Sequence, residues 1–227
     1  MWQHAVSSVP RINGAEMLRL WIDGVGAFVI SLKPTFTIGG PAEDNLAADW
    51  PIWSTLSRRH LEIVKTDDGF AMHPQGGVHI AGANVTSRLP LRHGTTLTLT
   101  DANASRLSVG AGDDSSVRLE FTQPHPLSLT GVLKLASPHR SVQTLDAVVL
   151  LHDCCLLGPR KSHHIVCRDW AGEVRLTSSD LGLVCQAETE LSVNDQPCGT
   201  TAIVEDAATV EGDGLRFRLE HMGERRR

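Results

Sequence analysis

Short runs in which hydrophobic and polar residues alternate recur along the chain, and clusters of Gly, Pro, Asp and Asn separate them. A period of two is typical of strands with one buried face, whereas the spacing of an amphipathic helix is scarce in this sequence. Short strands between turn residues indicate an all-β fold of the sandwich type. In the first half we expect strands at 17–21, 27–32, 35–38, 61–64, 70–73, 78–80, 97–99, 107–109 and 117–121.

The same pattern returns after Pro124 and Pro126, two residues that exclude a helix and disfavour a central strand. An offset of 113 residues sets Gly182 on Gly69, and residues 133–135, 154–158 and 215–220 repeat the character of 18–20, 36–39 and 117–121. An internal repeat of a β domain explains these matches. We therefore predict two tandem β-sandwich domains, with a flexible leader at 1–15, a first domain at 16–123, a linker at 124–126, a second domain at 127–221 and a tail at 222–227.

Charge and composition narrow the classes of partner. The formal net charge is −5, with 10 basic and 12 acidic residues before Pro124 and 11 and 14 after it, so we expect no nucleic-acid partner. The longest aliphatic run, 147–151, is far shorter than the roughly 20 residues of a membrane-spanning helix, and residues 1–4 do not resemble a signal peptide. All five cysteines lie in the second half without framework spacing, which favours reduced thiols and a cytoplasmic protein.

Polar side chains concentrate directly before the predicted strand 61–64. Four polar residues are consecutive there: Ser57, Arg58, Arg59 and His60. Ser57, the first of them, is two positions after Thr55. A hydroxyl donor and planar guanidinium donors suit a phosphate group. The alternative is a capped turn with solvated arginines. Arg59 follows Arg58 on an extended backbone and should point to the opposite face.

With Gly39 at the end of one strand upstream and Gly82 in a turn downstream, this segment resembles the forkhead-associated (FHA) domain. The family's pattern is a strand that ends in Gly-Arg, then Ser-x-x-His, then Asn-Gly turns before short strands, and the family reads phosphorylated motifs. The resemblance covers residues 16–122, and residues 127–221 more weakly. This sequence departs from the pattern at Gly40, which stands in place of the arginine, and at Gly76 and Ala81, which stand in place of the asparagines.

The resemblance implies a protein that binds phosphothreonine-containing peptides. It assigns the binding residues to Ser57, Arg58, Gln75 and Gly76, and structural support of the site to Gly39 and His60. At the offset of 113, the second copy has Trp170, Ala171 and Glu173 in place of Ser57, Arg58 and His60. We therefore expect a degenerate second domain with a structural or protein-docking role.

Cysteine and histidine side chains in the second half form a competing constellation. Thiolate and imidazole are preferred zinc ligands, but Cys154, Cys155, His163, His164 and Cys167 lack the Cys-x-x-Cys spacing of a zinc site. We therefore predict no metal, no cofactor and no catalytic residue. The expected function is that of a non-enzymatic signalling or adaptor protein, and the alternative is an FHA-like scaffold that contacts proteins without recognising phosphate. The partner and the oligomeric state stay open.

Overall fold

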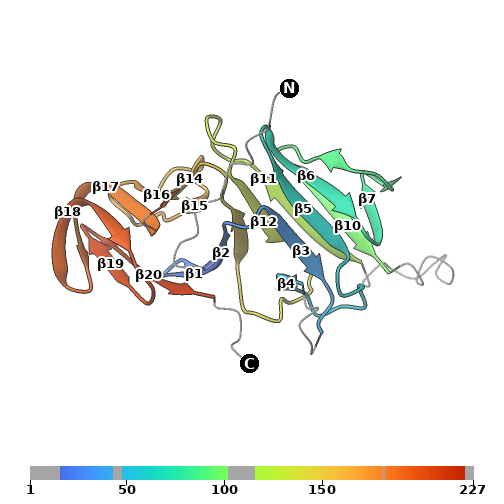
Figure 1. Ribbon diagram of the computed structural model, residues 1–227, viewed down its shortest axis with the longest axis horizontal. Coiled ribbons are helices and arrows are strands. Elements are labelled where there is room, and N and C mark those ends of the chain that lie inside the picture. Colours follow the sequence, from blue (N-terminus) through green and yellow to red (C-terminus); the bar gives the residue numbers. More distant parts are fainter. Residues whose placement is uncertain (1–15, 43–47, 102–115, 181, 223–227) are drawn as a thin grey trace, which may run out of the picture.

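The computed structural model describes residues 16–42, 48–101, 116–180 and 182–222, and every regular element in these ranges is a β-strand (Figure 1). The prediction of an all-β fold is confirmed for this part of the chain. The predicted leader at 1–15, the strand at 107–109 and residues 223–227 of the tail lie outside the described residues. The described part also holds no helix that is long and apolar enough to cross a membrane.

The strands of the first half are β1 (Met17–Ile22), β2 (Gly26–Ser31), β3 (Thr35–Gly39), β4 (Trp50–Pro51), β5 (Leu61–Thr66), β6 (Gly69–Pro74), β7 (Gly77–Ile80), β8 (Ala83–Val85), β9 (Leu89–Pro90), β10 (Thr95–Thr100) and β11 (Val117–Thr122). Those of the second half are β12 (Gly131–Leu135), β13 (Ala147–Leu150), β14 (Cys154–Gly158), β15 (Ile165–Val166), β16 (Val174–Ser179), β17 (Gly182–Val193), β18 (Gln196–Val204), β19 (Thr209–Gly212) and β20 (Leu215–His221).

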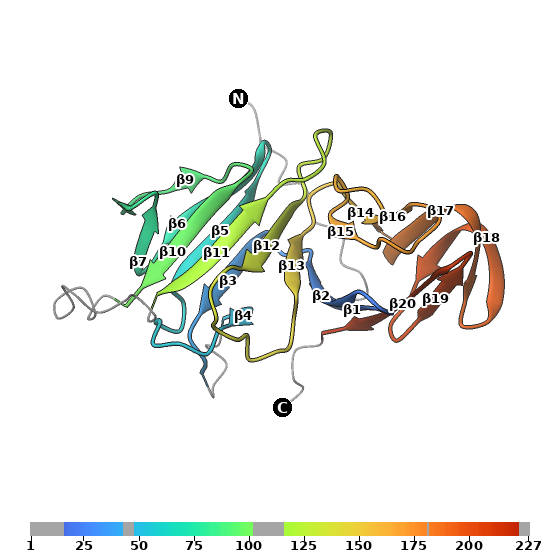
Figure 2. The ribbon, with the colours of Figure 1, turned by 180° about the vertical axis from the view of Figure 1, so that it is seen from behind.

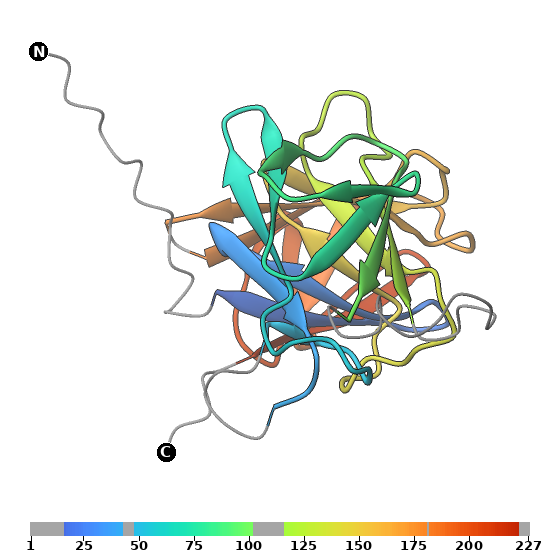
Figure 3. The same cartoon turned by 90° about the vertical axis from the view of Figure 1, so that its right-hand side faces the viewer.

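These strands form two sheets in an elongated molecule with two lobes (Figure 2). A five-stranded sheet has the order β4-β3-β5-β6-β9. A fifteen-stranded sheet runs through both lobes in the order β15-β14-β16-β17-β19-β20-β1-β2-β13-β12-β11-β10-β7-β8, with β18 paired to β17. Figure 3 looks along the length of the molecule, with the strands of the first half in front and the orange strands of the second half behind them.

The first hairpin of each half completes the sheet of the other half. In the β1–β20 pair Leu20 lies opposite Leu219, and in the β12–β11 pair Leu133 lies opposite Phe121. Each of these pairs, β1–β2 and β12–β13, is antiparallel and opens its half of the chain, while its first strand pairs with the last strand of the other half. We call them the exchanged hairpins. The predicted linker at 124–126 lies in the segment that connects β11 to β12, two neighbouring strands of one sheet.

The two exchanged hairpins meet in the middle of the molecule, where β2 and β13 pair in parallel. Alternate residues of β2 face different cores: Phe28 and Ile30 pack with the second half, and Val29 packs with the first. On β13, Val149 and Val148 divide in the same way. Strands buried on both faces require continuous apolar sequences, which accounts for the aliphatic run at 147–151. The two cores thus share one buried pair of strands.

Candidate functional site

His60 anchors the loop that contains the predicted phosphate-binding residues. Its side chain is buried, as predicted, with 1% of the residue surface exposed. Nε2 lies 3.0 Å from the carbonyl oxygen of Gly77, and Nδ1 lies 3.1 Å from Ser57 Oγ. A carbonyl only accepts, so in the neutral ring the proton sits on Nε2, and the Ser57 hydroxyl donates to Nδ1. This chain of hydrogen bonds joins the 51–60 loop to the start of β7.

The backbone of His60 is also held by hydrogen bonds. Its N–H donates to the carbonyl of Ile38 at 2.8 Å, and its carbonyl accepts from the N–H groups of Gln75 at 2.9 Å and Gly76 at 3.0 Å. A Cβ atom at Gly76 would overlap the imidazole ring. Gly76 is therefore required for the close approach of the β6–β7 turn to His60, while the Gln75 side chain is exposed and its Nε2 lies 3.3 Å from His73 Nδ1.

Gly39 and Gly40 are enclosed by the backbone of the same loop. A Cβ atom at Gly39 would overlap the Arg58 carbonyl, and one at Gly40 would overlap the Leu56 carbonyl. The N–H of Gly40 also donates to the Ser57 carbonyl at 2.9 Å. The position at which the FHA pattern has an arginine is consequently closed to any side chain in this loop conformation.

The exposed side of the loop is basic. Ser57, Arg58 and Arg59 are all exposed, and Ser57 Oγ lies 3.3 Å from the Arg59 carbonyl. Because the hydroxyl hydrogen of Ser57 is directed to His60, the guanidinium groups and the Gln75 amide are the donors best placed to bind an anion. Both nitrogens of His60 are already engaged, so this histidine is not available as a general base.

In the second half, the positions at the offset of 113 from Ser57 and His60 hold residues of a different chemical kind. Glu173, at the position of His60, accepts a hydrogen bond from His163 Nε2 at 2.9 Å, and His163 Nδ1 accepts from the N–H of Arg160 at 3.1 Å. Trp170, at the position of Ser57, is buried and stacks on Phe217 with 6.2 Å between the ring centroids. The His163–Glu173 pair was not found by sequence reasoning, because its members lie on different loops without a recognisable spacing.

The cysteine and histidine side chains of the second half do not gather at one site. His163 turns to Glu173, whereas His164 Nδ1 accepts a hydrogen bond from the N–H of Leu156 at 2.9 Å. Burial raises the pKa of the Cys155 thiol, and burial likewise raises that of Cys167 to about 12, so neither is a ready nucleophile. All five cysteines are unpaired, and the described residues contain no group of three or more side chains that could hold a metal ion.

A tryptophan that sequence reasoning did not single out lies on the same 51–60 loop. The N–H of Trp53 donates to the carbonyl of Arg140 at 2.8 Å, and Ile52 forms a β-bridge with Ser141. Residues 140–142 belong to the loop between β12 and β13, which passes beside β4 (Figure 2). The sequence offered no signal for this contact, because it depends on the exchanged hairpin.

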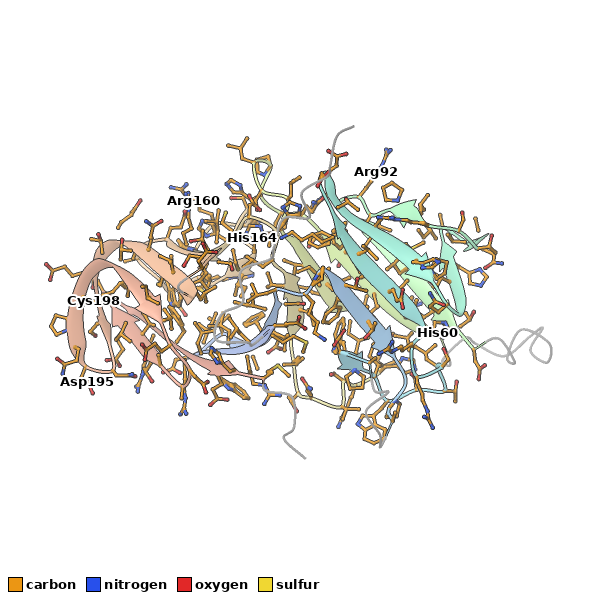
Figure 4. All side chains as sticks on the ribbon, in the orientation of Figure 1. His60, Arg92, Arg160, His164, Asp195 and Cys198 are labelled. Atoms are coloured by element: carbon orange, nitrogen blue, oxygen red, sulfur yellow. The ribbon has the colours of Figure 1, made fainter. Side chains whose placement is uncertain are left out.

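The loops around His60 therefore combine a fixed backbone with exposed guanidinium and amide donors, an arrangement that can hold an anion. His60 and Arg92 lie at opposite ends of the first lobe (Figure 4), so not every exposed arginine of this half belongs to the arrangement. A scan against protein-family models and searches of curated proteins and of solved structures found no match to this chain.

Proposed function

We propose that the protein is a non-enzymatic binding protein built from two sandwiches of the FHA type, and that the loops around His60 bind peptides that contain phosphothreonine. The observation that carries this proposal is the hydrogen-bond chain from Ser57 through His60 to Gly77. It fixes the loop that presents Arg58 and Arg59 before any ligand arrives. Binding to a preorganised loop loses less conformational entropy than ordering a mobile one.

Arg58 supplies the main contact in this proposal. A guanidinium binds a phosphate through charge-assisted, often bidentate hydrogen bonds. The exposed side chain of Gln75, on the turn whose backbone is bonded to the His60 carbonyl, is the neutral donor of the arrangement. Ser57 contributes chiefly by holding the loop, because its hydroxyl hydrogen is directed to His60. With one arginine fewer than the FHA pattern, the affinity should be lower by roughly ten- to a hundredfold.

Titration of a phosphothreonine peptide library and its unphosphorylated counterpart against the full chain tests the proposal. Arg58→Ala should weaken binding of the phosphorylated peptides at least about tenfold. Arg92→Ala is the matched control, because it removes another exposed arginine of the same lobe at the end away from His60. It should leave the affinity unchanged. Equal binding of phosphorylated and unphosphorylated peptides would exclude phosphate recognition.

The second candidate is a scaffold that contacts proteins without recognising phosphate. Two observations favour it: the Leu56 carbonyl closes the Gly40 position to a side chain, and the Ser57 hydroxyl hydrogen is directed to His60. This candidate predicts that Arg58→Ala binds its partner as tightly as wild type. Both candidates include a cytoplasmic signalling or adaptor role, which the five unpaired cysteines support, because such thiols persist in reducing compartments.

A further inference from the structure

Three side chains from the two repeats share one outward face beside the candidate site. Ile52 lies opposite Ser141 in an antiparallel bridge, and Ile52 is fully buried. Since successive residues of an extended segment point to opposite faces, Trp53 points outward, and so do Arg140 opposite it and Val142 diagonally across. Trp53 is 59% exposed, Val142 is 43% exposed, and Arg140 is exposed as well. We call this surface the Trp53 face.

The backbone under the Trp53 face is held in place on both sides. Arg140 accepts a hydrogen bond from the N–H of Trp53, and the N–H of Val142 donates to the Pro51 carbonyl at 2.9 Å. Trp50 Nε1 donates to Ser141 Oγ at 3.0 Å. An exposed indole on a fixed backbone suits ligand binding, because the aromatic side chain offers a large apolar area at little cost in conformational entropy.

The Trp53 face lies on the same loop as Arg58 and Arg59, a few residues along the chain. Trp53 and Ser57 belong to one loop that folds over Gly40, where the carbonyls of Ser54 and Leu56 both lie within contact distance of the position of a Cβ atom. Arg58, Arg59 and Arg140 are exposed. The loop therefore carries an exposed apolar surface within a few residues of positive charge, which complements a ligand with an apolar group close to an anionic one.

We infer that the Trp53 face binds a bulky apolar side chain located within a few residues of the phosphothreonine in the partner peptide. This inference rests on the proposed function and deepens it, because it assigns the residue preference of the site. A peptide fits better than a nucleic acid, since the chain carries a net charge of −5 and the first half has more acidic than basic residues. The second repeat thus supplies part of the specificity of the first, through the exchanged hairpin.

The test compares one phosphothreonine peptide with alanine at all flanking positions against relatives with Leu or Trp at single positions up to three residues away. The best apolar relative should bind the wild-type chain about tenfold more tightly. Trp53→Ala and Val142→Ser should remove most of this preference. Leu127→Ala is the control, because it removes an apolar side chain that is 88% exposed on the 124–130 segment, and it should keep the preference.

The outcomes separate this inference from the proposed function. If wild type shows no preference, or Trp53→Ala and Val142→Ser retain it, the Trp53 face is not the subsite, while loss of binding in Arg58→Ala still supports phosphate recognition. If the preference depends on Trp53 but not on phosphorylation, the subsite stands and the proposed function fails. Binding of a single-stranded oligothymidylate in place of every peptide would overturn both.

Discussion

At the scale of single residues, His60 determines the geometry of the candidate site. It bonds to Ser57 and Gly77 through its ring and to Ile38, Gln75 and Gly76 through its backbone. The ring is buried, so its removal leaves the Gly77 carbonyl without its donor and opens a void next to Gly76. These losses lower the stability of the fold directly. They weaken ligand binding only indirectly, by loosening the loop that presents the binding residues.

His60→Ala should therefore lower the free energy of unfolding by roughly 1–3 kcal/mol, because a buried acceptor loses its partner. Denaturant unfolding of the full chain measures this. His73→Ala is the matched control, since the His73 side chain is 52% exposed, and it should change stability by less than about 0.5 kcal/mol. An unfolding midpoint of His60→Ala equal to that of wild type would show that the ring is not buried against Gly76.

His164 makes stability depend on pH. Burial, and then the neighbouring His125, lowers its pKa from 6.5 to about 4, with Asp153 acting in the opposite direction. The unfolded chain then binds a proton that the folded chain does not, so stability is complete above about pH 6.5 and falls between about pH 6.5 and 4. The loss is roughly 3 kcal/mol at most, because one pKa unit corresponds to about 1.4 kcal/mol.

His164→Asn isolates this contribution, because its amide oxygen can accept the hydrogen bond from Leu156 and does not titrate. Unfolding free energies measured between pH 4 and 7 should show a flatter slope for this variant than for wild type. Identical slopes would mean that His164 titrates normally.

At the scale of elements, alternation in the sequence predicted most strands, including β1, β5, β11 and β20. The resemblance to the FHA domain assigned Gly39, Ser57, His60 and Gly76 to one site, and in the structure these residues lie together. The two-residue strands β4, β9 and β15 are too short to show a period. Their positions follow from pairing with distant segments, which the pattern within a strand does not encode.

Two hairpin turns, one in each half, share a backbone conformation that the sequence alone shows only weakly. Ala81 and Asn194, 113 residues apart, have positive φ values of 49° and 50°, and Gly82 and Asp195 follow them with 80° and 64°. Both pairs connect antiparallel strands, β7 to β8 and β17 to β18. Positive φ at two successive residues is typical of a type I′ hairpin turn. The backbone geometry is thus retained although the side chains at these positions differ.

At the scale of the whole molecule, the predicted linker at 124–126 lies between two strands, β11 and β12, that pair in one sheet. The alternation within β1 and within β12 is compatible with more than one neighbour, because Leu20 faces Leu219 and Leu133 faces Phe121, two similar apolar partners. Strand patterns specify which face is buried, and they do not specify which neighbour is chosen. The exchange is therefore visible only in the pairing of the folded chain.

Engineered disulfides test the exchange directly. Lys134 lies opposite Glu120, whereas a β12 strand that took the place of β1 beside β20, with Leu133 opposite Leu219, would set Lys134 opposite Arg218. All three residues at the tested positions, 120, 134 and 218, are exposed. Lys134→Cys combined with Glu120→Cys should form a disulfide within the monomer, detectable by mass spectrometry of the digested protein.

Lys134→Cys combined with Arg218→Cys is the matched control and should stay reduced in the monomer. A disulfide in this second pair, with none in the first, would show that each half keeps its own hairpin.

Because β1 pairs with β20, β1 cannot complete its pairing until β20 has been synthesised. Trp21 donates a hydrogen bond to Glu220, 199 residues later in the chain. At about 5–20 residues per second, the hairpin β1–β2 leaves the ribosome roughly 10–40 s before the strand that it finally joins. During this interval β11 emerges before β12, the strand that pairs with it in the sheet. Slower translation between residues 122 and 135 lengthens the time before β12 can pair with β11, so synonymous codon changes in this short stretch should act on folding without altering a residue.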